Sequence, residues 1–136
     1  MRDIKFRAWN IKRKIYKEVG RLWFDGNSNA IGAIERSNKQ DTIGVNHNGL
    51  GKIYDPEFVL EQFTGLKDKN GVEIYEGDYI EIDGNKQGFF EVVFLNQYVG
   101  GWNLKYKKET MSLGARKVYE LKVVGNIHEN PELLDV

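Results

Sequence analysis

The sequence predicts a mainly β protein, a β-rich α+β fold in which antiparallel strands form a small barrel preceded by an N-terminal hairpin. Two observations support this prediction. Apolar and polar residues alternate with the period of two that is typical of half-buried strands. Glycine and asparagine separate the alternating segments, which follow one another at a spacing of roughly ten residues, as in small sandwiches and barrels. We expect the remaining connections to be short helical turns.

The N-terminal hairpin is predicted from Ile4, Phe6 and Ala8, which alternate with Lys5, Arg7 and Trp9. A polar turn follows over residues 10–14. The chain then returns as strand pieces that we expect to be interrupted at Gly20. This segment is therefore predicted to be an antiparallel pair.

The next segment, residues 25–52, is rich in glycine and asparagine and holds only isolated apolar residues such as Ile31 and Ile43. We interpret it as a long loop with one or two weak strands. A loop of this length inside a compact domain is uncommon and often has a role.

The second half of the chain contains further runs with strand chemistry and ends in a helical turn over residues 130–134. Its order resembles the rhythm of SH3-like barrels, which is an argument by analogy. We expect one domain over 1–136, with the hairpin and loop in 1–54 and the barrel-like part in 55–136. The predicted strands of this part lie within residues 59–63, 79–82, 89–95, 102–106 and 118–127.

The composition excludes several classes of protein. The formal net charge is zero, from 20 basic and 20 acidic residues, so no overall basic field draws in nucleic acid. The chain has no cysteine, which rules out disulfides and thiolate chemistry and suits a reducing compartment. The N-terminus lacks a signal-peptide core, and apolar runs fall far short of the ~20 residues that span a bilayer. We therefore expect a soluble, cytoplasmic protein that does not bind membranes.

The charges are nevertheless unevenly placed. Met1–Leu22 carries eight Lys or Arg residues against two acidic ones, and Asp55–Asp83 carries nine acidic residues against two lysines. Opposite segments of this kind neutralise each other within a fold or between subunits. Alternatively, the basic segment forms a face that binds nucleic acid.

Four segments in the same order along the chain resemble one known family. They are Met1–Trp9, Gln62–Gly71, Ile74–Asp78 and Val124–Leu134. Together they span almost the full length, and the chain is similar to the YopX family of small phage and prophage proteins. The resemblance implies phage or prophage origin, synthesis in a bacterial cytoplasm and a homo-oligomer. Since no activity is established for the family, it supplies no catalytic residues.

Motifs for metal, nucleotide or nucleophilic chemistry are incomplete. Asp68 and Asn70 resemble part of a calcium loop, but the flanking ligand positions hold Leu66 and Gly77, so we expect a hairpin turn. The two histidines lie in unrelated segments. The glycines before Lys52 lack the spacing of a phosphate-binding loop. We therefore expect no catalytic residue, metal site or cofactor.

The densest carboxylate cluster follows the predicted turn. Two carboxylates on one strand face could bind a divalent ion or exchange protons with a substrate. The alternative is a solvated face with Ile80 and Ile82 pointing inward, while Asp78 accepts hydrogen bonds from turn amides. The cluster comprises Glu73, Glu76, Asp78, Glu81 and Asp83.

Basic residues near aromatic ones give the best binding candidate that the sequence offers, because stacking and phosphate contacts need only a surface. The tryptophans and tyrosines of a small β protein can equally belong to its core. The candidate nucleic-acid-binding residues are Arg7, Lys12, Arg13, Lys105, Lys107 and Arg116.

The sequence thus leaves three functional hypotheses in order. The first is a non-enzymatic phage or prophage accessory protein that binds itself and a host or phage protein through strand edges. The second is a nucleic-acid-binding module. The third, least favoured, is a metal-dependent enzyme that uses the carboxylate cluster.

Overall fold

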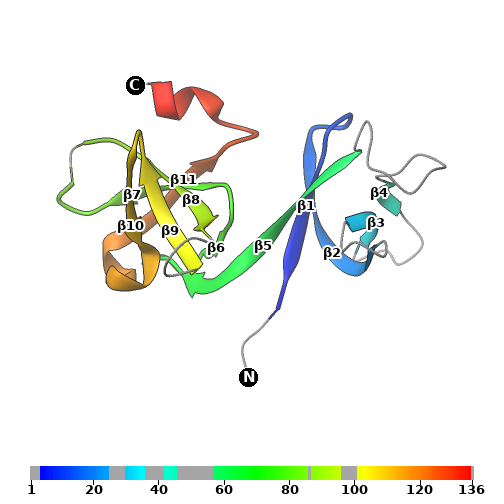
Figure 1. Ribbon diagram of the computed structural model, residues 1–136, viewed down its shortest axis with the longest axis horizontal. Coiled ribbons are helices and arrows are strands. Elements are labelled where there is room, and N and C mark those ends of the chain that lie inside the picture. The colour runs from blue at the N-terminus through cyan, green and yellow to red at the C-terminus, as the bar shows by residue number, and fades with distance from the viewer. Residues whose placement is uncertain are drawn as a thin grey trace. The chain divides into compact units, whose positions relative to one another are not determined.

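The fold is mainly β and antiparallel, as predicted, and its only helical elements among the described residues are short 3-10 turns (Figure 1). The computed structural model describes residues 4–24, 30–35, 42–45, 57–85, 87–95 and 101–135. The chain divides into two compact units. Unit 1 comprises Met1–Ile4 and Phe63–Val136, and unit 2 comprises Lys5–Gln62. Along the chain, the boundaries between the units follow Ile4 and Gln62.

Unit 2 is an antiparallel sheet in the order β4-β3-β2-β1-β5. The predicted N-terminal hairpin is confirmed, with Arg7 opposite Glu18 and Asn10 opposite Ile15. Gly20 does not end the returning strand, because the register shifts there as a bulge and the strand continues. The strands of this unit are β1 (Phe6–Asn10), β2 (Ile15–Phe24), β3 (Ala30–Glu35), β4 (Thr42–Val45) and the first half of β5 (Phe58–Lys67).

The two weak strands expected in the central stretch are β3 and β4, which pair with each other. The other positions of that stretch, including His47 and the glycines before Lys52, lie outside the described residues. The described core of unit 2 is small. Ala8 and Phe58 are buried, and three partly buried side chains pack against them: Val19, Leu22 and Leu60.

Unit 1 contains a five-stranded antiparallel sheet in the order β10-β9-β8-β7-β11, and a hairpin of β6 with the second half of β5. The barrel expected from the strand rhythm is not closed, since β10 and β11 are opposite edges of the sheet. These strands are β6 (Glu73–Tyr75), β7 (Asp78–Ile82), β8 (Phe90–Leu95), β9 (Gly101–Tyr106), β10 (Glu109–Ser112) and β11 (Leu121–Asn126).

Three 3-10 turns complete unit 1, namely η1 (Leu113–Ala115), η2 (Val118–Glu120) and η3 (Pro131–Asp135). The last confirms the helical turn expected at the C-terminal end. The run predicted as a strand from residue 118 begins as η2 instead, because Glu120 N–H bonds back to Lys117 O at 2.9 Å. The strand itself starts at Leu121.

The core of unit 1 follows the period of two. Alternate residues of β7 and β8 are buried on one face, and one residue each from β6, β9, η1 and β11 completes the cluster. Fully burying each such side chain contributes about 1.5–3 kcal/mol. The members are Ile74, Ile80, Ile82, Phe90, Val92, Leu104, Leu113 and Leu121.

Candidate interaction surfaces

The buried carboxylate of Asp68 binds the backbone at the turn that follows β5. Its Oδ1 accepts hydrogen bonds from the N–H groups of Asn70 (2.8 Å) and Val72 (2.9 Å). Its Oδ2 accepts one from Val123 N–H of β11 at 2.9 Å. The expected turn is confirmed, and Gly71 supplies its positive φ of 81°.

Opposing influences set the pKa of Asp68. Burial by itself raises it, but the three amide hydrogen bonds and the charge of Lys69 outweigh burial and hold the pKa below its usual value. The carboxylate therefore stays ionised, and its lone pairs are used within the fold.

The same turn caps one edge of the five-stranded sheet. Lys69 N–H bonds to Leu121 O at 3.0 Å, and Asp68 receives Val123 N–H. Both of these β11 backbone groups lie on the side of the strand that faces away from β7. In an antiparallel pair, the backbone N–H and C=O groups of successive residues point alternately toward and away from the partner strand, so those of Leu121 and Val123 point away from β7. The edge of β11 is thus occupied by the chain itself.

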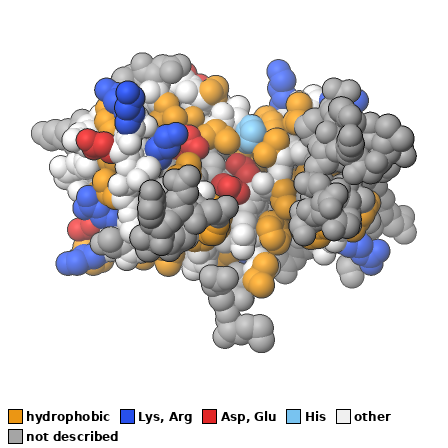
Figure 2. All heavy atoms as spheres, in the orientation of Figure 1, with side chains coloured by type: hydrophobic (Ala, Val, Ile, Leu, Met, Phe, Trp, Pro, Cys, Tyr) orange, Lys and Arg blue, Asp and Glu red, His pale blue; other side chains and the backbone are white. Residues whose placement is uncertain are grey.

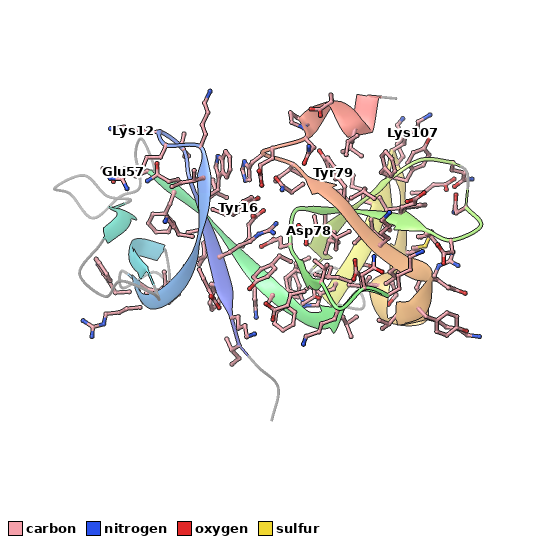
Figure 3. The ribbon with its side chains drawn as sticks, turned by 180° about the vertical axis from the view of Figure 1, so that it is seen from behind. Lys12, Tyr16, Glu57, Asp78, Tyr79 and Lys107 are labelled. Atoms are coloured by element: carbon pink, nitrogen blue, oxygen red, sulfur yellow. The ribbon has the colours of Figure 1, made fainter. Side chains whose placement is uncertain are left out.

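Two further polar side chains of this region also bind backbone. Thr64 donates its hydroxyl to Ile74 O at 2.7 Å and accepts Leu66 N–H at 3.2 Å. Asp78, which is 2% exposed at the start of β7 (Figure 3), accepts Tyr75 N–H through Oδ2 at 2.8 Å. This agrees with the interpretation of Asp78 as a turn acceptor.

Two of the remaining carboxylates, Glu81 and Asp83, are exposed. Ile80 and Ile82 point into the core and Glu81 is exposed, as the solvated-face interpretation expects. Asp83 forms an ion pair with Lys69 at 2.9 Å. Within the described part of the chain, no three His, Cys, Asp or Glu side chains form a group that could hold a metal ion.

The segment from Asn126 to Asn130 is a second backbone anchor. Asn126 Oδ1 accepts the N–H groups of His128 (3.1 Å) and Glu129 (2.8 Å). Its Nδ2 donates to Glu129 Oε1 at 3.0 Å, and Asn130 Oδ1 accepts Asn126 N–H at 3.3 Å. These contacts fasten η3 to the end of β11.

Of the predicted nucleic-acid-binding residues, Arg7 is already engaged within unit 2. Its Nε donates to Oε1 of Glu61 at 3.1 Å, and its guanidinium lies 4.2 Å from the ring centroid of Tyr16. Glu61 is 2% exposed. Arg7 is therefore a structural cation, whereas Lys12 and Arg13 are exposed in the turn between β1 and β2 (Figure 3 labels Lys12).

The other three candidates lie in unit 1. Lys105 is opposite Glu91 in the β8–β9 pair, where burial raises the pKa of Glu91 and the charge of Lys105 opposes that rise. Lys107 is exposed at the tip of the β9–β10 hairpin (Figure 3), with Nζ 5.3 Å from the Tyr106 ring centroid. Arg116 donates through Nε to Met111 Sδ at 3.3 Å.

The structure thus divides the six residues between the units, three in each. In the left-hand part of Figure 2, which is unit 1, the Lys and Arg side chains are scattered among uncharged and acidic ones. Lys105 and Lys107 share the β9–β10 hairpin.

The aromatic side chains divide between core and surface. Trp9 is buried and Trp102 packs against the core of unit 1, as the core interpretation expects. Tyr119 in η2 is 63% exposed beside Val118, and Lys117 Nζ lies 5.7 Å from its ring centroid. Sequence reasoning missed this pair because it placed both residues in a strand. The charged neighbours Lys117 and Glu120 were the available signal.

The edge of the five-stranded sheet opposite to β11 is β10. Among the described strands, β10 has a neighbour on one side only, namely β9. Thr110 and Ser112 are exposed on it, and η1 and η2 follow directly.

The protein is thus an antiparallel β protein in which buried polar side chains such as Asp68, Asp78 and Asn126 accept hydrogen bonds from the backbone of turns. The YopX family, described as YopX protein, matches residues 5–135, so the chain belongs to that family and the resemblance seen in the sequence is confirmed. No curated protein is significantly similar to it.

A solved structure shares the fold. Protein EF1440 from Enterococcus faecalis is 30% identical in sequence, with a TM-score of 0.69, and the similarity covers 98% of this chain and 99% of that one. In the described residues, no helix is both long enough and apolar enough to cross a membrane.

Proposed function

We propose that this YopX-family chain is a non-enzymatic accessory protein of phage or prophage origin that acts in the bacterial cytoplasm by binding other proteins, first of all a second copy of itself. Membership of the family and the likeness to a protein from a bacterium support the origin. The observation that carries the binding role is the contrast between the two edges of the sheet in unit 1.

One of these edges is capped, and the other has no strand beside it within the described part of the chain. The Asp68 turn satisfies the outward N–H of Val123 and the outward carbonyl of Leu121 on β11. A strand edge without such a cap presents backbone donors and acceptors to another strand. Of the described strands none covers the outer side of β10.

Exposed apolar residues of the same unit favour a protein partner. Tyr119 and Val118 in η2, between β10 and β11 in the chain, expose apolar surface, and tyrosine is enriched at protein interfaces because its ring is large and loses little rotamer freedom. A second copy satisfies the edge by pairing β10 with its own equivalent in antiparallel register, and the exposed tyrosine of each copy is a further candidate contact. A homo-oligomer follows.

The test is the mass of the full-length protein in solution as a function of concentration, measured by light scattering after size exclusion. β9 and β10 are joined by a two-residue turn, and the residues that flank such a turn, here Tyr106 and Glu109, exchange backbone hydrogen bonds. The N–H of the next residue, Thr110, therefore points away from β9. Thr110→Pro therefore removes an outward donor without removing a ladder bond. We expect the wild type to form dimers or larger oligomers, and Thr110→Pro and Tyr119→Ser to dissociate at least tenfold more readily.

Val72→Ser is the matched control, since Val72 is also an exposed apolar residue of unit 1 and lies in the capping turn. It should leave the association unchanged. A wild type that stays monomeric at all concentrations contradicts self-association. A pull-down from bacterial lysate, with and without nuclease and at two salt concentrations, then decides whether a different protein occupies the edge.

A further inference from the structure

Lysine occupies an unfavourable backbone conformation at two hairpin tips. Lys14 has φ 56° and Lys107 has φ 54°, and these are the only described residues other than glycine with positive φ. Side chains crowd the backbone in this region, which glycine enters freely. Elsewhere the described chain does use glycine at such positions, namely Gly65, Gly71, Gly77, Gly84, Gly88 and Gly101. The two lysines therefore keep a charged side chain where glycine would suit the backbone better.

The tip of the β1–β2 hairpin is held rigidly. Arg13 N–H donates to Asn10 Oδ1 at 2.7 Å, and Lys14 N–H donates to Asn10 O at 2.8 Å. Ile11 N–H donates to Glu57 O at 3.0 Å, which ties the tip to the start of β5. The three consecutive cations Lys12–Lys14 are exposed on this fixed backbone. A rigid presentation lowers the entropy that binding removes.

The charge around this tip is mainly positive. Between Phe6 and Phe24 the sequence holds six Lys or Arg residues and one acidic residue, Glu18. Glu18 lies opposite Arg7, at the other end of the hairpin. Among the described residues, Glu57 is the acidic residue bonded to the tip through its backbone. The three positive charges of Lys12–Lys14 outnumber its one negative charge.

We infer that the tip formed by Ile11–Lys14 binds the phosphate backbone of a nucleic acid, independently of sequence. Three adjacent cations on long stems suit a ligand with regularly repeated negative charges, and the exposed position accommodates a long polymer. This inference goes beyond the proposed function, because it concerns unit 2 and needs no self-association. DNA and RNA share the chemistry that the tip recognises.

The second tip is a natural comparison within the same chain. Lys107 and Lys108 are exposed there, but Glu109 follows directly and is exposed as well. Lys105 lies opposite Glu91. This tip has the same backbone feature and a smaller excess of positive charge, so we expect it to contribute little.

The experiment measures the binding of the full-length protein to fluorescently labelled duplex DNA, single-stranded DNA and single-stranded RNA of one sequence by anisotropy. Salt is varied from about 50 mM to about 200 mM, and three phosphate contacts on duplex DNA predict a slope of about −2.7 in log K against log salt. The test variant combines Lys12→Gln, Arg13→Gln and Lys14→Gly. It should bind at least tenfold more weakly at low salt and show a slope close to zero.

The control variant combines Lys107→Gly and Lys108→Gln, and should keep its affinity within twofold. Because glycine suits both positive-φ positions, neither variant should melt at a lower temperature than the wild type. The ratio of the DNA and RNA affinities identifies the preferred nucleic acid. Equal losses in both variants, or no binding of any of the three nucleic acids by the wild type at low salt, would overturn the inference. Either result leaves the self-association test unaffected.

Discussion

At the scale of single residues, the polar side chains of two family-like segments, Gln62–Gly71 and Ile74–Asp78, act on the backbone. Asp68 accepts three amide hydrogen bonds, Asp78 accepts the N–H of Tyr75 within its own turn, and the Thr64 hydroxyl both donates and accepts. Turn amides that are buried away from water need such acceptors. A segment that is acidic in sequence is thus a set of hydrogen-bond acceptors in the structure.

Asp68→Asn should destabilise the protein by about 1–3 kcal/mol, because the amide that replaces one oxygen cannot accept the N–H that faces it. The free energy of unfolding in urea measures the loss. Asp83→Asn is the matched control, since its carboxylate is exposed and makes an ion pair at the surface, where such pairs contribute about 0–1 kcal/mol. Similar losses in the two variants would show that the buried acceptor role is wrong.

The lowered pKa of Asp68 also predicts a pH dependence. A carboxyl whose pKa is lower in the folded state stabilises that state above its usual value of 3.8 and loses this contribution as pH falls toward the folded-state pKa. The stability difference between the wild type and Asp68→Asn should therefore be largest at neutral pH and shrink below 3.8. Urea titrations of both proteins at a series of pH values test this, and a difference that grows on acidification would contradict it.

At the scale of elements, β11 is fixed on two sides. The Asp68 turn caps its outer edge, and Asn126 and Asn130 join its end to η3. Gly125 lies at the register shift of β11, where its backbone approaches the side chain of Asn130 closely. Close approach is the reason for glycine here, since its φ is not in the left-handed region.

Gly125→Ala should cost about 1–3 kcal/mol, as expected for an added methyl group in a packed site. The new Cβ would lie 2.6 Å from Asn130 Oδ1 and 3.0 Å from Asn130 Cβ, so the asparagine must move and loosen its bond to Asn126. Thermal unfolding measures the effect. Gly114→Ala is the control, because the nearest atom to its Cβ is Ser112 Oγ at 3.8 Å and the variant should melt close to the wild type.

At the scale of the whole molecule, the two units differ in their described cores. Unit 1 has eight buried apolar side chains in one cluster, while the described cluster of unit 2 has two. Local stability follows the apolar contacts that an element makes. Unit 1 should thus be the more stable of the two.

Hydrogen exchange followed by mass spectrometry tests this difference. Peptides from β7, β8 and β9 should exchange more slowly than peptides from β1 and β2, because opening unit 1 exposes more apolar surface. The Asp68→Asn variant provides the internal reference, since it should speed exchange in β11 before that in β1. Equal protection of both units in the wild type would show that they unfold as one.

Much of the fold could be predicted from the sequence because its signals are local. Alternation identified the hairpin of β1 and β2, and Asp68–Gly71 identified a turn. Closure of a barrel could not be predicted, since it depends on whether distant strands pair. The error at Val118–Tyr119 has a different cause, since the hydrogen bond from Glu120 N–H to Lys117 O forms a 3-10 turn inside a run with strand-like composition and the tyrosine is exposed.

The sequence by itself determined the mainly β class, the family, the N-terminal hairpin and the acceptor role of Asp78, because periodicity and turn chemistry act over a few residues. Only the tertiary structure decided how the basic residues are used. It engages Arg7 with Glu61 and Tyr16, opposes Lys105 with Glu91, and leaves Lys12 and Arg13 exposed on a rigid tip. Partners far apart in sequence meet only through the pairing of strands, and no local pattern records which strands will pair.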